Sequence, residues 1–315
     1  MPAPLKWRRK VALAKLESTY ATDSAPTGAA NAMLLSNVEI RPMEGEDTTR
    51  EIEWPHLGAQ PQIPTGLRAT LTGSIELVGS GTEGVAPAWG PLLRACGCAQ
   101  VITPDTSVAY TPISTEMESV TIHFWIDGIR HVLRGARGTV EIGINAQSVP
   151  SARFTMTGLW SKPTDTAPAT PNFTAFRAPL VATMAHTPVF IVDATPLVLR
   201  SFSFNMGNSV EPRLLIGREE ILITDRQELI SATVEAVPLA TLDPFELAQD
   251  QNNTFAVTIT HGPSTLAGFR TTIAAPRCQM MRLEGYENNQ NVLEWPLRMR
   301  PLFNSGNDQF SITLH

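Results

Sequence analysis

The order of apolar and polar residues predicts a protein built mainly of β-strands. Residues 69–78 show the clearest alternation, with leucine and isoleucine on one face and threonine, serine and glutamate on the other, as in a half-buried strand. Residues 119–125 and 130–134 predict two further strands, and the Asp127-Gly128 dipeptide between them is typical of a hairpin turn. Residues 91–96 predict a short helix, because a glycine directly follows the last apolar position.

This series of strands, one short helix and further strands occurs twice. In the first half the elements are residues 33–40, 69–78, 87–96, 119–125, 139–144 and 153–158, and in the second they are residues 197–206, 228–237, 243–248, 255–261, 278–283 and 292–298. The corners agree in chemistry as well: Leu57-Gly58 matches Ile216-Gly217, Gly135-Ala136-Arg137 matches Ala275-Pro276-Arg277, and Phe154 matches Trp295. We therefore predict two tandem β-sandwich or barrel domains, each with one short α-helix.

The length of 315 residues fits two domains of about 150 residues each. Many prolines and alanines with little periodicity follow residue 160, which is typical of an extended linker. The predicted parts are an extended N-terminal arm at 1–31, a first domain at 32–160, a Pro/Ala-rich linker at 161–195 and a second domain at 196–315.

The composition indicates a surface that partners cover. Charged residues make up 17% of the chain, below the ~25% of ordinary soluble domains. The net charge of −6 argues against a protein that grips nucleic acid through its phosphates, since such a protein needs a basic face. Three cysteines (Cys96, Cys98 and Cys278) cannot form a paired framework, so we expect buried thiols and folding in the cytoplasm. Neither a secretory signal nor a membrane span is apparent in the sequence.

Two segments are candidates for contact with a neighbouring subunit. The arm carries the cationic run Lys6, Trp7, Arg8 and Arg9, which is either a frayed terminus or, as we expect from its tryptophan, a segment that docks on an acidic subunit.

The second candidate is residues 42–66, which include Glu51, Glu53 and Trp54. A stretch this long without its own strand pattern tends to be functional or flexible. We expect a β-hairpin extension that folds against a neighbour.

The sequence offers no catalytic, cofactor or metal-binding constellation. Residues 79–84 match G-x-G-x-x-G, but two prolines interrupt the helix that a dinucleotide site would need. His123 and His131 could face each other across the predicted hairpin, yet no cysteine or carboxylate lies close in sequence to complete a zinc site. Paired carboxylates such as Glu219-Glu220 are interpreted as solvated charges. We expect neither an enzyme nor a cofactor.

Several short segments along nearly the whole chain resemble the major tail tube proteins of long flexible-tailed (siphovirus-type) bacteriophages. They are Lys10–Asp23, Pro26–Asn31, Glu39–Gly45, Gly79–Gly84, Pro87–Gly97, Gly135–Gly138, Leu215–Gly217, Ile223–Arg226 and Ser305–Asp308. The resemblance implies tube domains that form rings, which stack into a hollow tail tube through which double-stranded DNA passes into the host. It also implies that loops and the N-terminal arm bind ring to ring.

The expected partners follow from this resemblance and from the duplication. They are further copies of the chain, the tape-measure protein, the tail terminator and baseplate proteins, and passing DNA that is not held tightly; no membrane is involved. Two equivalent domains per subunit let three subunits close a ring with pseudo-sixfold symmetry. If the second half decorates the outside instead, the ring would be a hexamer. The protein would be a virion component assembled in the host cytoplasm.

An acidic lining would repel DNA and let it slide, since basic linings bind phosphates. The strand carboxylates Glu76, Glu141 and Glu235 are the candidates for this lining, although the sequence leaves open which sheet face is inward. Deleting residues 1–31 is expected to leave rings that cannot stack.

The sequence also leaves alternatives open. One is the inner-tube protein of a contractile injection or secretion system, which carries protein rather than DNA. Another is a two-domain carbohydrate-binding β-sandwich protein, although the aromatic content of 7% is low for exposed sugar platforms. An enzyme is the third alternative.

Overall fold

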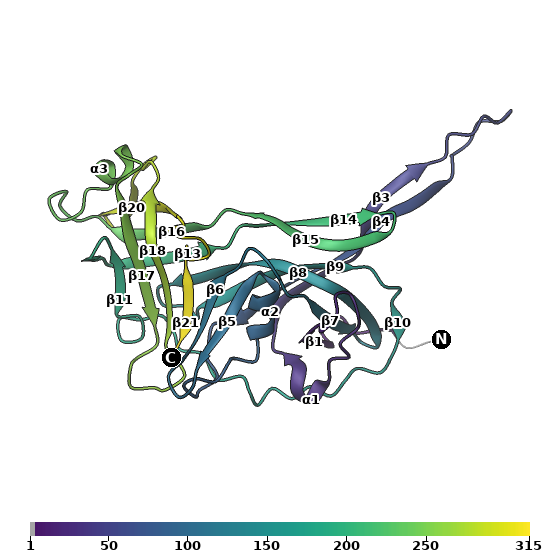
Figure 1. Cartoon of the computed structure of the whole chain (residues 1–315), viewed down its shortest axis with the longest axis horizontal. Coiled ribbons are helices and arrows are strands. Elements are labelled where there is room, and N and C mark those ends of the chain that lie inside the picture. The colour runs from purple at the N-terminus through teal and green to yellow at the C-terminus, as the bar shows by residue number, and fades with distance from the viewer. Residues whose placement is uncertain (1–3) are drawn as a thin grey trace.

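The computed structural model describes residues 4–315 and shows a mainly β protein with antiparallel strands (Figure 1). This confirms the predicted fold class. The described strands form large open sheets and do not close into a barrel.

The first half forms a β-sandwich. Its elements are β1 (Lys10–Leu16), α1 (Gly28–Asn31), β2 (Ala32–Met33), β3 (Ser36–Thr49), β4 (Gln62–Glu76), α2 (Gly90–Ala95), β5 (Cys98–Thr103), β6 (Ser107–Pro112), β7 (Val120–Ile126), β8 (Ile129–Asn145) and β9 (Ser151–Leu159). One layer contains β1 and β7, the other contains β3, β4 and β9, and the long strand β8 passes from the first layer to the second. The change of layer occurs at a register shift beside Gly135, whose φ of +58° and contact with the Tyr20 ring leave no room for a side chain.

The second half contains the remaining elements. After the short strand β10 (Thr164–Asp165) come β11 (Val189–Val192), β12 (Thr195–Pro196), β13 (Leu199–Asn205), β14 (Asn208–Leu215), β15 (Arg218–Arg226), β16 (Leu229–Glu235), α3 (Pro244–Gln249), β17 (Thr254–His261), β18 (Thr271–Met280), β19 (Glu287–Asn289), β20 (Val292–Pro301) and β21 (Ser311–Leu314). The last strand, β21, pairs with both β18 and β6.

The strand pairing of the first half repeats in the second. The order β3–β4–β9–β8–β7–β1 has its counterpart in β13–β16–β20–β18–β17–β11. Both β8 and β18 have a bulge opposite their hairpin partner. By strand pairing, Ala136 of the first half corresponds to Cys278 of the second, and Phe154 corresponds to Leu297. The sequence comparison had aligned Ala136 with Pro276 and Phe154 with Trp295, so each of these two matches is two residues too early.

A single sheet runs through both halves, because β13 of the second half pairs with the end of β8 in the first. The resulting order is β3–β4–β9–β8–β13–β16–β20. Phe202 lies opposite Ile144 and Phe204 opposite Ile142, and each of these four side chains is at most 2% exposed. The two halves therefore share one hydrophobic core.

Two of the predicted segments differ from their expected form. Strand β1 lies between β2 and β7, and Leu13 in it is 1% exposed, so most of the predicted arm is part of the fold. Residues 1–3 of that arm lie outside the described residues. Deleting residues 1–31 would therefore remove β1 and its pairing with β7, so this deletion would disturb the fold and not only the expected stacking of rings. In the predicted linker, β10 pairs with β8 and β11 pairs with β17.

Local signals in the sequence were accurate. The Asp127-Gly128 turn has positive φ at both residues, as a tight hairpin requires. The predicted helix at 91–96 is α2, and residues 79–84 form a loop before it. His131 lies opposite Phe124 rather than His123, so the two histidines do not form a cross-strand pair.

The shared core predicts a large effect of truncation at the junction. Phe204→Ala should lower the free energy of unfolding by roughly 3–5 kcal/mol, because it leaves a cavity between the halves. The neighbouring change Ser203→Ala, on the polar face, should alter it by less than about 0.5 kcal/mol. Urea unfolding followed by circular dichroism measures both, and equal effects would contradict a shared core.

Candidate assembly surfaces

The sheet that spans both halves has one apolar face in the core and one polar face. On the polar face the ladders place Glu141 beside Arg153 of β9 and Asn205 of β13. Ser203 donates a hydrogen bond to Glu141 Oε1 at 3.1 Å. Serine and threonine make up much of the rest of this face, alternating with buried residues. The surface is therefore polar but only sparsely charged.

The three candidate lining residues share this face. Glu76, Glu141 and Glu235 are all exposed, and they come from β4, β8 and β16. The strand pairing places them on one side of the sheet, because paired residues share a face and successive residues along a strand alternate between the two faces. Their role as a lining stays a prediction.

The hairpin of β3 and β4 extends well beyond the body, as expected from residues 42–66 (Figure 1). Its root is fixed where Thr70 donates a hydrogen bond to Glu44 Oε2 at 2.6 Å. At its far end Glu51 and Glu53 are exposed, and Trp54 is 64% exposed. We call residues 42–66 the extension.

The hairpin of β14 and β15 is the counterpart of the extension, but it lies across the first half (Figure 1). Arg137 of β8 forms an ion pair with Glu220 at 3.0 Å, and both side chains are about 10% exposed. Arg137 also donates to the carbonyl oxygen of Ile221 at 2.7 Å. A buried ion pair is tolerable only when its remaining polar atoms are hydrogen-bonded, as they are here.

Tyr20 completes this attachment. Its hydroxyl accepts a hydrogen bond from the Ile221 N–H at 2.6 Å and donates one to the Gly135 carbonyl at 3.3 Å. Burial raises the pKa of Tyr20, so its proton stays available for the second bond. Further along the hairpin, Arg226 donates to the Gly97 carbonyl at 3.0 Å, and Asn208 donates to those of Cys96 and Gly138.

The sequence pattern gives no sign of this attachment. Glu220 was interpreted as a solvated charge and is instead 8% exposed, whereas Glu219 beside it is exposed. No local pattern around Glu220 indicates this contact, because its partner Arg137 lies far away in the sequence.

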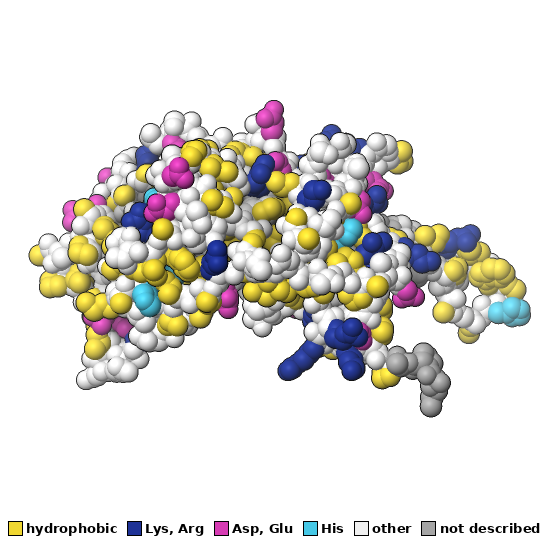
Figure 2. All heavy atoms as spheres, turned by 90° about the horizontal axis from the view of Figure 1, so that it is seen from below, with side chains coloured by type: hydrophobic (Ala, Val, Ile, Leu, Met, Phe, Trp, Pro, Cys, Tyr) yellow, Lys and Arg dark blue, Asp and Glu magenta, His cyan; other side chains and the backbone are white. Residues whose placement is uncertain are grey.

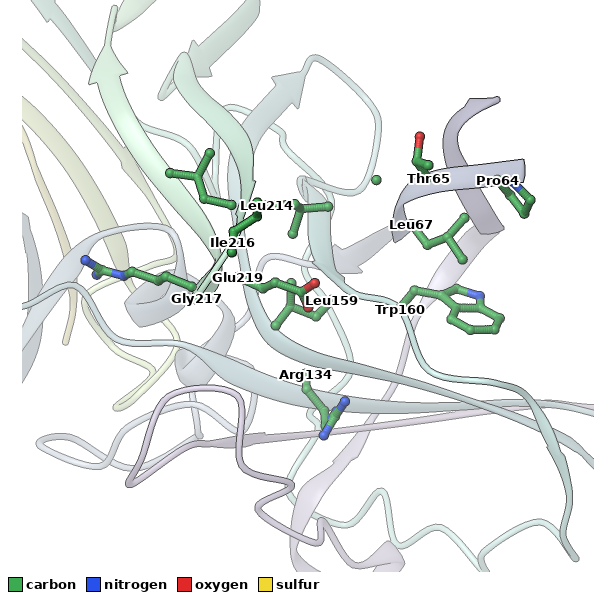
Figure 3. A pocket seen from close by; sticks show the side chains of 13 residues that line it. Pro64, Thr65, Leu67, Arg134, Leu159, Trp160, Leu214, Ile216, Gly217 and Glu219 are labelled. Atoms are coloured by element: carbon green, nitrogen blue, oxygen red, sulfur yellow. The ribbon is translucent and has the colours of Figure 1, made fainter. Parts of the chain in front are cut away.

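A groove of about 910 Å³ separates the two hairpins (Figure 3). Leu67, Leu159 and Trp160 line one side, and Leu214 and Ile216 line the other. Ile216, at the tip of the shorter hairpin, is fully exposed. The groove is open, and Thr65, Arg134 and Glu219 line it together with these apolar side chains.

The N-terminal candidate residues lie beside the turn of β7 and β8. Lys6, Trp7, Arg8 and Arg9 are exposed, and Trp7 lies under the Lys10 ammonium at 3.8 Å. Asp127 in the turn accepts a bond from the Lys6 N–H and pairs with Arg9, each at 2.5 Å. The N-terminal candidates and those of the extension thus belong to two separate parts of the surface (Figure 2). Their contact roles stay predictions.

The thiols are poorly suited to nucleophilic chemistry. Cys96, Cys98 and Cys278 are free and buried, and burial raises the pKa of Cys98 and Cys278 to about 12. Within residues 4–315, no three or more histidine, cysteine or acidic side chains gather closely enough to hold a metal ion. No helix in the same residues is long and apolar enough to cross a membrane.

Comparison with protein families identifies the chain. The model of the phage tail tube protein family matches residues 7–300, and the chain belongs to this family. It is therefore a virion tail component of the structural kind, and membership implies assembly into a tube of stacked subunits. No curated protein matches the chain.

The attachment of the β14–β15 hairpin gives a direct test. Glu220→Ala should lower the free energy of unfolding by roughly 3–5 kcal/mol, because it leaves Arg137 buried and unpaired. Limited proteolysis should then cleave the hairpin faster. Glu219→Ala is the matched control and should change neither property by much. Equal protease resistance of the two variants would contradict the anchoring role.

Proposed function

We propose that this protein forms the tail tube of a long flexible-tailed bacteriophage and is the conduit for double-stranded DNA entering the host. Three copies would close a ring with pseudo-sixfold symmetry, and rings would stack around the tape-measure protein between terminator and baseplate. It would have no catalytic role and would assemble in the host cytoplasm. The continuous sheet through both halves carries this proposal.

The two ends of that sheet support ring closure. At one end β3 pairs only with β4 among the described strands, and its core-facing Val38 and Ile40 are partly buried. At the other end of the sheet lie residues 281–285, which come after β18 in the chain and run beside β20. The Met281 N–H donates a hydrogen bond to the Arg298 carbonyl, and Leu283 is partly buried. In the first half the corresponding end of β8 is covered by β13.

We infer that β3 of one copy covers residues 281–285 of the next, as β13 covers β8 within the chain. This pairing would bury Val38, Ile40 and Leu283 and remove both open sheet edges. Since one such junction already lies inside each chain, three copies supply six junctions in all. The same reasoning favours the trimer over a hexamer with decorating second halves.

The polar sheet face is the proposed lumen. Glu76, Glu141 and Glu235 would then point toward the DNA from among serine and threonine hydroxyl groups, which carry no positive charge to bind phosphates. The sparse negative charge would repel the duplex weakly along the whole tube.

Microscopy of purified protein tests the proposal. Negative-stain images should show rings or tubes, and light scattering should give a ring mass of three chains. Ile40→Lys should prevent ring closure, because it places a charge at the buried edge, while circular dichroism stays unchanged. A wild-type protein that remains monomeric at every concentration would overturn the proposal.

The N-terminal residues before β1 are proposed to join one ring to the next. Deleting residues 1–9 should leave three-chain rings intact and prevent their stacking, because β1 and its pairing are retained. Size-exclusion chromatography and tube counts on micrographs measure the two steps separately. Normal tubes from the truncated protein would contradict this role.

A further inference from the structure

The internal repeat shows what a hairpin of this kind covers. The β14–β15 hairpin lies over β8 and β9 of the first half, where it covers Arg137, which is 8% exposed. Arg137 lies opposite Thr157 in the β8–β9 ladder. The matching positions of the second half are Gln279 of β18 and Arg300 of β20, which lie opposite each other. Arg300 is exposed, so the equivalent surface has no cover within the chain.

This uncovered surface is rich in arginine. Arg298 and Arg300 alternate with buried residues on β20 and are exposed, while Arg277 at the bulge of β18 is partly exposed. Arg282 lies two residues after the end of β18 and is exposed. None of these four side chains has a carboxylate within salt-bridge distance among the described residues. We call them the arginine cluster.

The extension has the opposite charge and is also uncovered. Glu46, Asp47, Glu51 and Glu53 are exposed and form no ion pair among residues 4–315. The extension is directed away from the second half of its own chain (Figure 1). Its acidic residues therefore need a second molecule to meet the arginine cluster.

We propose that the acidic extension of one copy lies across the arginine cluster of the next copy, as the β14–β15 hairpin lies across the first half of its own chain. The inference rests on the proposed ring and names the surface that selects the neighbour. Counting from the matching tips at Gly58 and Gly217, Pro61 takes the place of Glu220. The Pro61 carbonyl accepts a bond from the Arg50 N–H at 3.0 Å, so Arg50 lies opposite this position. Glu51 is the next residue, and Asp47 and Glu53 each lie three residues away, so carboxylates surround this single cation.

Other charged residues near the extension and near the arginine cluster also affect whether the two surfaces are complementary in charge. Arg41 and Arg68 of the hairpin root already pair with Glu44, so these cations leave the outer carboxylates free. On the receiving side, Glu235 and Glu294 face each other across β16 and β20, and Glu294 is paired with Arg200. The net charge offered to the extension by the end of β20 is therefore positive.

Charge reversal in the full chain tests the proposal. Asp47→Lys with Glu51→Lys should weaken ring formation by roughly tenfold or more, measured by sedimentation velocity, since two charge-assisted contacts become repulsive. Arg277→Glu with Arg300→Glu should have the same effect. Combining all four changes should restore most of the lost association, because the signs are then complementary again.

The matched control is Glu211→Lys with Glu219→Lys, two exposed carboxylates of the β14–β15 hairpin with the same change in charge. It should form rings like the wild type. Loss of rings in this control to the same extent, or normal rings from the Asp47 and Glu51 variant, would overturn the inference while leaving the tube function in place. The extension is exposed, so its variant decides the question even if the arginine variant fails to fold. A wild-type chain that forms no rings would remove both proposals together.

Discussion

The pairing of β13 with β8 is the constraint on which the rest of the structure depends. It joins the halves through backbone hydrogen bonds and through four side chains that are almost completely buried, Ile142, Ile144, Phe202 and Phe204. Because a strand presents alternate residues to opposite faces, this one register also fixes the polar side of the sheet. A slip by one residue would bring Glu141 into the core. The same contact thus defines the core and the polar face of the sheet.

The attachment of the β14–β15 hairpin shows how a polar contact can direct assembly. Arg137, Glu220 and Tyr20 are taken out of water, which carries a desolvation cost that a pair of apolar residues would avoid. These polar residues fix the orientation of the hairpin, because the guanidinium group of Arg137 has its donors in fixed positions. They hold the hairpin over the first half and away from its own half. In the proposed ring the acidic extension and the arginine cluster would form a contact of the same charge pattern between two copies.

Much of the fold could be predicted from local patterns, and the failures have physical causes. Residues 69–78 alternate because one face of β4 is solvated. By contrast, β1 is covered on both sides over Ala12, Leu13 and Ala14, so it shows no alternation, and its basic flanks resemble an arm. Strand β11 is four residues long and follows a proline-rich stretch, which hid it in the linker. Glu220 could not be found at all, because its burial depends on Arg137, which lies far away in sequence.

Duplication changes what the junctions of a ring can do. In a ring of identical single domains every junction is formed by the same residues, so a substitution at one junction occurs at all of them. Here β13 already occupies the edge of β8, so an incoming β3 can pair only at the second half. In the proposed ring the two kinds of junction would be free to differ: the inner one is apolar and covalently linked, while the outer one would combine a short apolar edge with opposite charges. Halves must alternate around such a ring, and the number of chains is half the number of domains that its curvature accommodates.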